Sequence, residues 1–299
     1  MTAALGMGTY RARGVPEAAE AAIRSGVYWI DTAPNYHHGK DEALLAPVLK
    51  THRGVRLSTK VGFLSEPQQD EAVRRRVLTH SEAGQGHSLA PQYVRWQVAR
   101  SKEALGRTPD VVFLHNPEHG GPSPIRLADR ILRAFGALEE CCNRGLIKGY
   151  GVATWSALHD GSLTVEELVD LARSAGGAAH RLRAIQLPLS LVQLGPLADA
   201  VDGYGVLIDA RSAGLDVYAS APLHGGELTD IITPPVADEL LPGATPLRII
   251  LGTVASAPGV TRVLLSASTA KHWSEAAQGA LGHSLDTNDL RRITDAFRT

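Results

Sequence analysis

The chain has 299 residues, 44% of them hydrophobic and 20% charged, and a formal net charge of -1 at pH 7. It is long enough to bury a substantial core, and its charge gives no reason to expect a nucleic acid or an anionic membrane as a partner. The only cysteines, Cys141 and Cys142, are adjacent, which disfavours a disulfide, and no apolar run could span a bilayer or serve as a secretion signal, so we expect a cytoplasmic protein.

Short apolar runs rich in β-branched residues alternate along the chain with longer segments of helical period. The near-continuous apolar character of several short runs is typical of parallel strands that are buried on both faces. The predicted strands are residues 4–9, 27–31, 55–60, 110–115, 149–153, 184–188, 215–219 and 261–265. The predicted helices are residues 16–25, 40–49, 91–105, 126–144, 164–175, 196–213, 246–257, 271–280 and, at the end of the chain, 286–297.

Strict alternation of strands and helices allows an open doubly wound sheet or a closed barrel. The open sheet would carry a Gly-x-Gly-x-x-Gly loop after an early strand, but Gly6 and Gly8 are followed by Arg11 where the third glycine would stand. Eight units in about this length favour the α/β barrel of eight parallel strands, the (β/α)8 or TIM barrel. Because no linker or fixed-period repeat divides the sequence, we expect residues 1–299 to form one domain.

Two connections are unusually long. Residues 62–90 follow the third predicted strand, and residues 222–245 follow the seventh. We expect both to be irregular loops, and loops of this length are usually functional or disordered. Both leave the carboxyl ends of strands, the face on which barrel enzymes build their sites.

Four polar residues lie at, or just beyond, the carboxyl ends of three consecutive predicted strands. Asp31 ends the second strand, and Tyr36 follows it. Lys60 ends the third strand and His115 the fourth. In a barrel these ends meet at one opening, so we expect the four side chains to lie close together.

These residue types suit one kind of chemistry. A nearby ammonium lowers the pKa of a phenol, and a carboxylate balances the charge of a buried lysine. A neutral histidine can donate a hydrogen bond to a carbonyl oxygen. Together the four groups would form a proton donor beside a site for an oxygen atom, as carbonyl reduction requires.

Each residue alone has a plainer interpretation. A lysine at a strand end is usually solvated, a loop tyrosine usually packs, an aspartate often caps a turn, and a histidine can be a satisfied residue of the barrel mouth. The occurrence of all four at the functional end of neighbouring strands favours the chemical interpretation.

In these segments the sequence resembles the aldo-keto reductase superfamily. The likeness rests on Asp-Thr-Ala-x-x-Tyr at 31–36, Ser-Thr-Lys at 58–60, the histidine strand at 110–117 and the turn at 145–152, found in the family's order over nearly the whole chain. It implies a hydride transfer between a nicotinamide cofactor, NADP with NAD as the second possibility, and a small-molecule aldehyde, ketone or alcohol.

The resemblance also implies a role for each member of the tetrad. Tyr36 would be the general acid in reduction and the base in oxidation. Lys60 would lower the pKa of Tyr36 and pair with Asp31, and His115 would orient the substrate carbonyl.

The same resemblance implies the cofactor contacts. Gln186 would hold the nicotinamide amide, and Ser268 would contact the ribose phosphate near a helix N-terminus. The plainer interpretations are a polar residue that lines the barrel and an ordinary helix cap. The implied set is Gly8, Thr9, Asp31, Gln186, Ser220, Pro222, Leu223, Ser266, Ser268, His272 and Glu275.

Several positions depart from the family's pattern. Ala153 and Thr154 stand where the family has Ser-Asn, and Ser220 stands where a stacking aromatic is expected. His272 stands where the family has a basic residue that pairs with the 2′-phosphate, and the adjacent Lys271 could take that role. The resemblance therefore favours NADP over NAD less strongly. Ala276 replaces the adenine-contacting asparagine, and further candidates to line the substrate pocket are Trp155, His37, His38 and His224.

Two other functions stay open. One is a regulatory or partner protein on the same barrel that binds a nicotinamide with little turnover. The other keeps the chemistry but reduces an imine or a biosynthetic intermediate. A metal at His37 and His38 is not expected, because no carboxylate or cysteine completes a ligand set.

Overall fold

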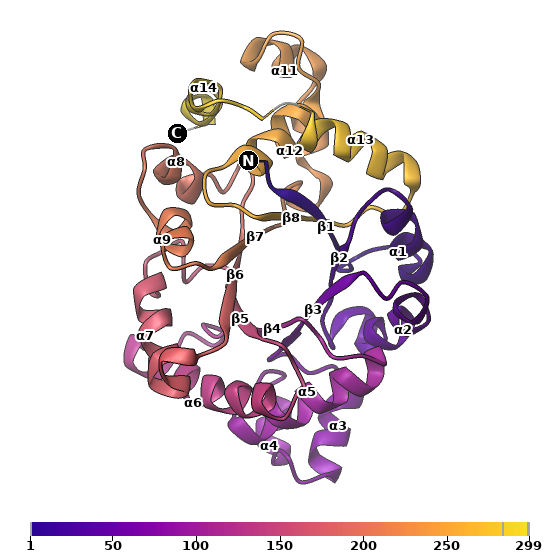
Figure 1. The fold of residues 1–299 in the computed structure, drawn as a ribbon, viewed down its shortest axis with the longest axis vertical. Coiled ribbons are helices and arrows are strands. Elements are labelled where there is room, and N and C mark those ends of the chain that lie inside the picture. Colours follow the sequence, from indigo (N-terminus) through magenta and orange to yellow (C-terminus); the bar gives the residue numbers. More distant parts are fainter. Residues whose placement is uncertain (1, 283, 298–299) are drawn as a thin grey trace.

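The computed structural model describes residues 2–282 and 284–297. Its core is a closed barrel in which eight parallel strands follow one another in chain order, surrounded by helices (Figure 1). The predicted barrel is confirmed, and every predicted strand lies within two residues of an observed one. The strands are β1 Ala4–Gly8, β2 Trp29–Asp31, β3 Arg56–Val61, β4 Val111–His115, β5 Tyr150–Ala153, β6 Leu182–Pro188, β7 Asp216–Ser220 and β8 Arg262–Leu265.

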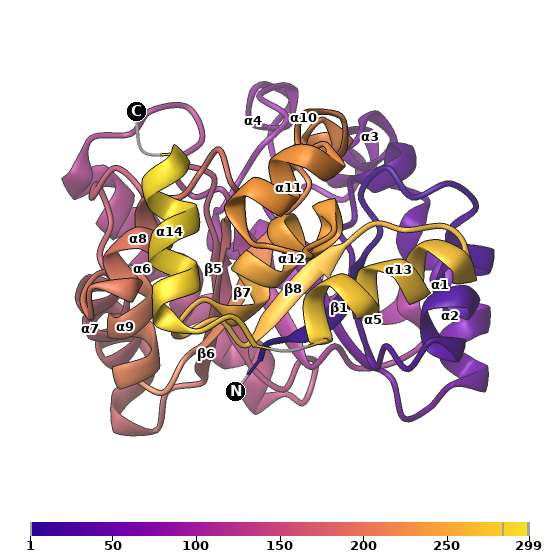
Figure 2. The same ribbon diagram turned by 90° about the horizontal axis from the view of Figure 1, so that it is seen from above.

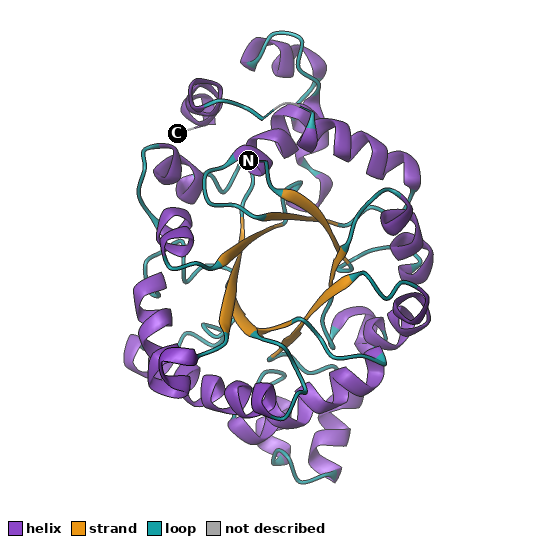
Figure 3. Cartoon of the chain, in the orientation of Figure 1, coloured by secondary structure: helices purple, strands orange, loops and turns teal. Residues whose placement is uncertain are grey.

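The outer helices form a ring around the strands (Figure 3). Those that match predicted segments are α1 Val15–Arg24, α2 Asp41–Thr51, α5 Pro91–Leu105, α6 Pro124–Asn143, α7 Val165–Gly176, α12 Pro246–Ser256, α13 Ala270–Leu281 and α14 Thr287–Phe297, and a short 3-10 helix, η2 Gly177–Ala179, follows α7. Among the described residues, no helix is long and apolar enough to cross a membrane.

The predicted helix at 196–213 is wrong as a single element. It is two short helices, α8 Gly195–Val201 and α9 Val206–Ser212. Gly203 and Gly205 lie between them with φ of 92° and 83°. A left-handed backbone cannot continue a right-handed helix, so the chain turns between the two segments.

The two long connections are not irregular, which corrects the prediction for both. Residues 62–90 contain α3 Glu66–Arg74 and α4 His80–Gly84, and residues 222–245 contain η3 His224–Gly226, α10 Leu228–Ile231 and α11 Pro234–Leu240. Both α3 and α4 begin with a capping box, formed by Ser65 with Gln68 and by Thr79 with Glu82. Helices α3, α4, α10 and α11 lie on the side of the barrel away from the N-terminus (Figure 2).

Large side chains fill the barrel interior. The ring of Tyr218 packs edge-on against Trp29 and Phe113, with centroids 5.3 and 5.4 Å apart. The Arg262 guanidinium lies 4.4 Å from the Trp29 ring, a cation–π contact for a buried charge. Phe113 lies over Gly151, where a Cβ would come within 2.6 Å of its ring. The interior is therefore a packed core, which leaves the strand ends as the place where a site could form.

A buried carboxyl group lies just outside the barrel, behind Lys60. The Oε1 atom of Glu42 accepts a hydrogen bond of 2.6 Å from Thr59 Oγ1. Burial raises the pKa of Glu42 to about 7, although hydrogen bonds from Thr59 and Ser101 oppose the shift. The folded protein therefore holds a proton on Glu42 at pH values where the unfolded chain has lost it.

This carboxyl group makes stability depend on pH. The contribution of Glu42 is fully present below its ordinary pKa of 4.5 and is lost as pH rises towards about 7. Between about pH 5 and about pH 8 the wild type should lose up to ~3 kcal/mol of unfolding free energy through the titration of Glu42. Glu42→Gln cannot titrate at this position, so the unfolding free energy of the variant should fall by that much less. Urea unfolding at both pH values measures this, and an unchanged pH dependence in the variant would rule Glu42 out as the cause.

Candidate active site

An ion pair stands at the carboxyl ends of β2 and β3. The Lys60 Nζ donates to Asp31 Oδ2 at 2.5 Å and to the Thr32 carbonyl oxygen at 3.0 Å. Ser58, which pairs with Asp31 across the two strands, donates its hydroxyl to Asp31 Oδ1 at 2.6 Å. The Trp29 indole in turn donates to Ser58 Oγ at 3.0 Å. Both charges are buried, and these hydrogen bonds hold them in one geometry.

Tyr36 lies directly against this pair. It begins the short helix η1, Tyr36–Gly39, five residues after the last residue of β2. The Lys60 Nζ lies 5.1 Å from the Tyr36 ring centroid, and its charge lowers the pKa of Tyr36. The His115 ring is edge-on to Tyr36 with centroids 6.1 Å apart. The structure thus brings Asp31, Tyr36, Lys60 and His115 together.

Local geometry fixes the Tyr36 turn. His37 and His38 adopt left-handed backbone angles, with φ of 45° and 55°, which reverse the chain before α2. The His37 Nδ1 lies 2.5 Å from Asp41 Oδ1, and Asp41 is fully buried. His37 is therefore held by α2, and its role as a free pocket residue, one of the sequence-based candidates, is not favoured.

The pKa of Tyr36 differs from the expectation. Burial raises it above the ordinary value of 10.0, Lys60 lowers it, and Asp31 raises it again, so that the net direction is upward. The predicted effect of lysine has the right sign but is smaller than the effect of burial. The phenol is consequently protonated at neutral pH, as a proton donor must be.

The other two titrating groups differ in charge, because Lys60 is a cation and His115 is neutral. Burial lowers the pKa of Lys60, but Asp31 and Tyr36 raise it by more, so the ammonium keeps its proton. Burial, with Lys60 and His87 nearby, lowers the pKa of His115 well below 6.5. Its Nδ1 is buried without a hydrogen-bond partner among residues 2–282 and 284–297. A neutral ring with its proton on Nε2 avoids burying an unpaired N–H group.

Two buried polar groups on β5 and β6 fit an amide-bearing ligand. Thr154 follows β5, and its backbone N–H donates to the Gln186 carbonyl at 2.9 Å. In the described part of the chain, Gln186 Nε2 and Thr154 Oγ1 are both buried and have no hydrogen-bond partner. Leaving such atoms unpaired is costly. A donor and a hydroxyl at adjacent strand ends match the carboxamide of a nicotinamide.

The predicted phosphate residues lie where β8 meets β1. Ser266 donates to the carbonyls of Gly8 and Tyr10, at 2.7 and 2.8 Å, and Ser268 Oγ accepts from the Arg13 backbone at 3.2 Å. These serines therefore join two loops through hydrogen bonds to the backbone. Thr9 is buried and donates to Thr32 Oγ1 at 2.9 Å, so its hydroxyl proton is already used in a hydrogen bond inside the protein.

The remaining predicted cofactor residues lie around the same edge. His272 is exposed in the first turn of α13, and Glu275 lies one turn later, 3.8 Å from Lys271. Glu275 also lines a surface hollow with residues 241–248. Ser220, the last residue of β7, and Leu223 are half-buried, whereas Pro222 is buried.

The sequence did not point individually to Phe63, which stands beside His115, or to His119, which stands beside Phe63. The Phe63 ring is edge-on to His115 and to His119, with centroids 4.9 Å apart in each pair. Phe63 follows Lys60 by three residues, so its place after a strand end was the available signal. Trp155 is 54% exposed at the mouth, where its backbone N–H donates to Glu118 Oε1.

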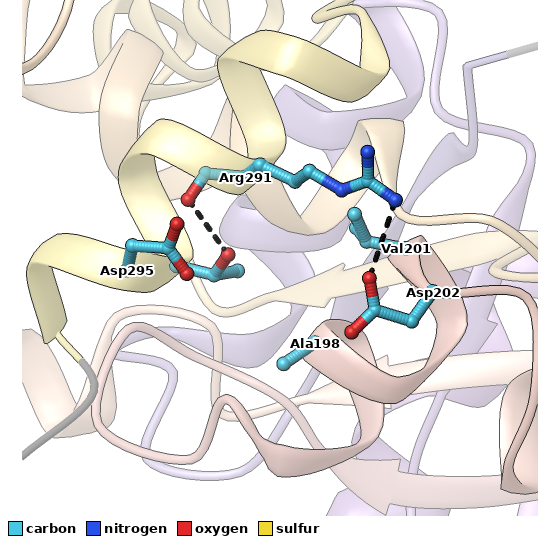
Figure 4. Close-up of a pocket in the computed structure, with 6 residues that line it drawn as sticks. Ala198, Val201, Asp202, Arg291 and Asp295 are labelled. Atoms are coloured by element: carbon cyan, nitrogen blue, oxygen red, sulfur yellow. Dashed lines mark hydrogen bonds and ion pairs between the residues drawn. The ribbon is translucent and has the colours of Figure 1, made fainter.

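A second hollow lies on the outside of the barrel, between α8 and α14 (Figure 4). Arg291 spans it and meets Asp202 at 3.3 Å. None of its lining residues belongs to a strand end, so it is separate from the site described above.

Sequence comparison identifies relatives. Residues 2–235 match the model of the aldo/keto reductase family. A D-threo-aldose 1-dehydrogenase from a Pseudomonas species is 29% identical over 143 residues. That match covers 45% of this chain and 42% of the relative, less than half of its length.

Solved structures share the fold across almost the whole chain. The holo form of an aldo-keto reductase from Bacillus halodurans has a TM-score of 0.71 at 18% identity, covering 98% of this chain and 92% of that one. An aldo-keto reductase from a Medee basin deep-sea metagenome library has a TM-score of 0.66 at 17% identity, covering 98% and 89%. At such identities the likeness concerns the fold alone.

Proposed function

The chain belongs to the aldo/keto reductase family, and we propose that it transfers a hydride between NADP and a small-molecule aldehyde or ketone, or the matching alcohol. The observation that carries the proposal is the contact of Lys60 with both Asp31 and Tyr36, beside a neutral His115.

Each residue of the tetrad has one task in this reaction. The bound nicotinamide would supply or accept the hydride. His115 would donate a hydrogen bond from Nε2 to the substrate oxygen and fix its orientation. Tyr36 would give its hydroxyl proton to that oxygen in reduction and take it back in oxidation. Lys60 would stabilise the phenolate, and Asp31 would keep Lys60 charged.

We propose that the cofactor lies across the mouth, from β6 to the start of α13. Gln186 and Thr154 would hold the carboxamide, and the segment from Ser266 to Glu275 would hold the adenosine end. Lys271 and His272, exposed in the first turn of α13, support NADP over NAD because a 2′-phosphate needs a positive neighbour.

The substrate test is a panel of carbonyl compounds with NADPH and NADH, read by the absorbance of the reduced nicotinamide. The likeness to an aldose dehydrogenase adds aldoses with NADP and NAD to the panel. Turnover that prefers NADP supports the proposal. Tight retention of the cofactor with no turnover on any compound would contradict it and would favour a protein that senses the nicotinamide.

Gln186→Leu tests the carboxamide site. The variant removes one hydrogen-bond donor, so the cofactor Kd should rise about 10-fold while the fold stays intact. Fluorescence titration with NADPH measures this. Gln92→Leu, an exposed change of the same kind on α5, is the control. Equal affinities of wild type and Gln186→Leu would place the nicotinamide elsewhere.

A further inference from the structure

The segment 62–90 leaves the barrel after Lys60 and returns to the mouth, and it contacts the backbone near Tyr36 and at His115. Its first contact is Gln68, which is 1% exposed on α3. The Gln68 Nε2 donates to the Pro34 carbonyl oxygen at 2.8 Å, two residues before Tyr36. Its Oε1 accepts from the Ser65 backbone N–H at 2.7 Å. Both ends of the amide are thus used, and α3 is tied to the Tyr36 turn.

The second contact is His87, near the far end of the segment. The His87 ring is 8% exposed, and its Nε2 lies 2.8 Å from the His115 carbonyl oxygen. Burial lowers the pKa of His87 to about 4, so the ring is neutral at physiological pH. Because a carbonyl oxygen can only accept, the Nε2 must carry the proton and donate it. His87 therefore ties this segment to the end of β4.

The segment is closed on itself at its base. Phe63 and His87 pair as an isolated antiparallel bridge. The Ser88 N–H donates to the Gly62 carbonyl at 2.9 Å, and the Leu64 N–H donates to the Gly86 carbonyl at 2.9 Å. Residues 62–64 and 86–88 thus form a short antiparallel ladder. Because residue 62 directly follows β3, this ladder fixes His87 relative to the strand that carries Lys60.

At two glycines, the segment 62–90 and the barrel mouth approach each other too closely for a larger side chain to fit. Gly62 has a φ of 153°, and a Cβ there would lie 2.8 Å from both the His115 carbonyl oxygen and His87 Nε2. A Cβ at Gly39, in the Tyr36 turn, would lie 2.6 Å from Ser65 Oγ. Larger residues at either position would push the segment away from the groups that it contacts.

We propose that Gln68 and His87 are positioning residues, and that the segment 62–90 is a brace that sets the separation of Tyr36 from His115. The inference rests on the proposed function, because that function makes the separation matter. The proton donor and the hydrogen-bond donor must reach one substrate oxygen together, and a misplacement of about 1 Å can cost ~100-fold in rate.

His87 allows a matched test. His87→Leu removes the donor but keeps an apolar side chain of similar size, whereas His87→Gln places an amide N–H near the same point. We expect kcat to fall between ~10-fold and ~100-fold in His87→Leu, the cofactor Kd to stay unchanged, and His87→Gln to recover most of the loss. His52→Leu, which breaks a contact with Glu20 on the outer helices, is the control.

Gln68 is tested against the cap that it shares. Gln68→Met removes the contact with Pro34, so Tyr36 should move away from Lys60. In alcohol oxidation, kcat rises with pH along a limb that is set by the ionisation of Tyr36. In this variant the limb should shift to higher pH, and kcat should be lower. Ser65→Ala keeps both hydrogen bonds of the Gln68 amide and removes a buried hydroxyl that has no hydrogen-bond partner among the described residues, so it should change neither kcat nor the limb.

The outcomes separate the brace from the proposed function. Reduced stability with unchanged kcat in both His87→Leu and Gln68→Met overturns the brace and leaves the function intact. A wild-type protein that turns over no carbonyl overturns the function, and crystal structures of the wild type and His87→Leu then decide the brace. A Tyr36–His115 ring separation that stays at 6.1 Å in the variant would overturn it.

Discussion

Tyr36→Phe should lower kcat for carbonyl reduction by roughly 10²- to 10⁴-fold, the usual contribution of a positioned general acid. The phenylalanine ring can keep the packing of Tyr36 against Tyr10, whose ring centroid is 5.1 Å away. What is lost is the hydroxyl whose pKa the Lys60 charge lowers and that would supply the proton. Steady-state kinetics with NADPH and the best substrate of the panel measure the effect.

The control for this variant is Tyr10→Phe, which removes a hydroxyl from the neighbouring ring. Tyr10 is 54% exposed and has no part in the proposed proton transfer. Its kcat should stay within about three-fold of the wild type, as expected of a surface change. Substantial turnover by Tyr36→Phe would show that the proton comes from another group.

Lys60→Met should be the most destabilising of the site variants. It removes the cation from a buried pair and leaves the Asp31 carboxylate uncompensated, which typically costs about 3–5 kcal/mol. Urea unfolding at neutral pH measures the loss. Activity should fall as well, because nothing then stabilises the Tyr36 phenolate.

The double variant Asp31→Asn with Lys60→Met separates charge from packing. Removing both charges leaves two uncharged side chains of similar shape. Much of the lost stability should therefore return, while activity stays low. If the double variant is as unstable as Lys60→Met alone, the loss reflects packing of the lysine stem rather than an unpaired charge.

The strands and the tetrad could be predicted because their signals are local. Runs such as 111–114 are apolar at every position, which is what a strand buried on both faces requires. His115 follows this run and Lys60 ends the predicted third strand, so the closure of the barrel brings the two side chains together. Alternation alone also allowed an open sheet, and closure was predicted from the eight units in this length and from the missing third glycine after the first strand.

The helices of the segment 62–90 were predictable in part. Ser65 with Gln68 and Thr79 with Glu82 have the capping-box spacing, which marks a helix start. The composition of the segment, rich in charged and polar residues, obscured that signal. The break in residues 196–213 was similarly visible in Gly203 and Gly205, two glycines in the middle of a helical pattern.

Other features depend on tertiary contacts that no local pattern encodes. The contacts of Gln68 with Pro34 and of His87 with His115 join residues 34 and 28 positions apart. The direction of the pKa of Tyr36 depends on how completely the ring is buried, and the sequence gives only its neighbours. The lysine effect was predictable, but the balance between burial and charge was not.

The pH profile of alcohol oxidation in the wild type and in Lys60→Met tests the tetrad most directly. Oxidation requires the phenolate, so kcat should rise with pH along a limb set by Tyr36. If the ammonium stabilises that phenolate, the limb lies at higher pH in Lys60→Met than in the wild type. A limb at the same or lower pH in the variant would mean that the lysine does not tune the tyrosine, and the proposed chemistry would be wrong.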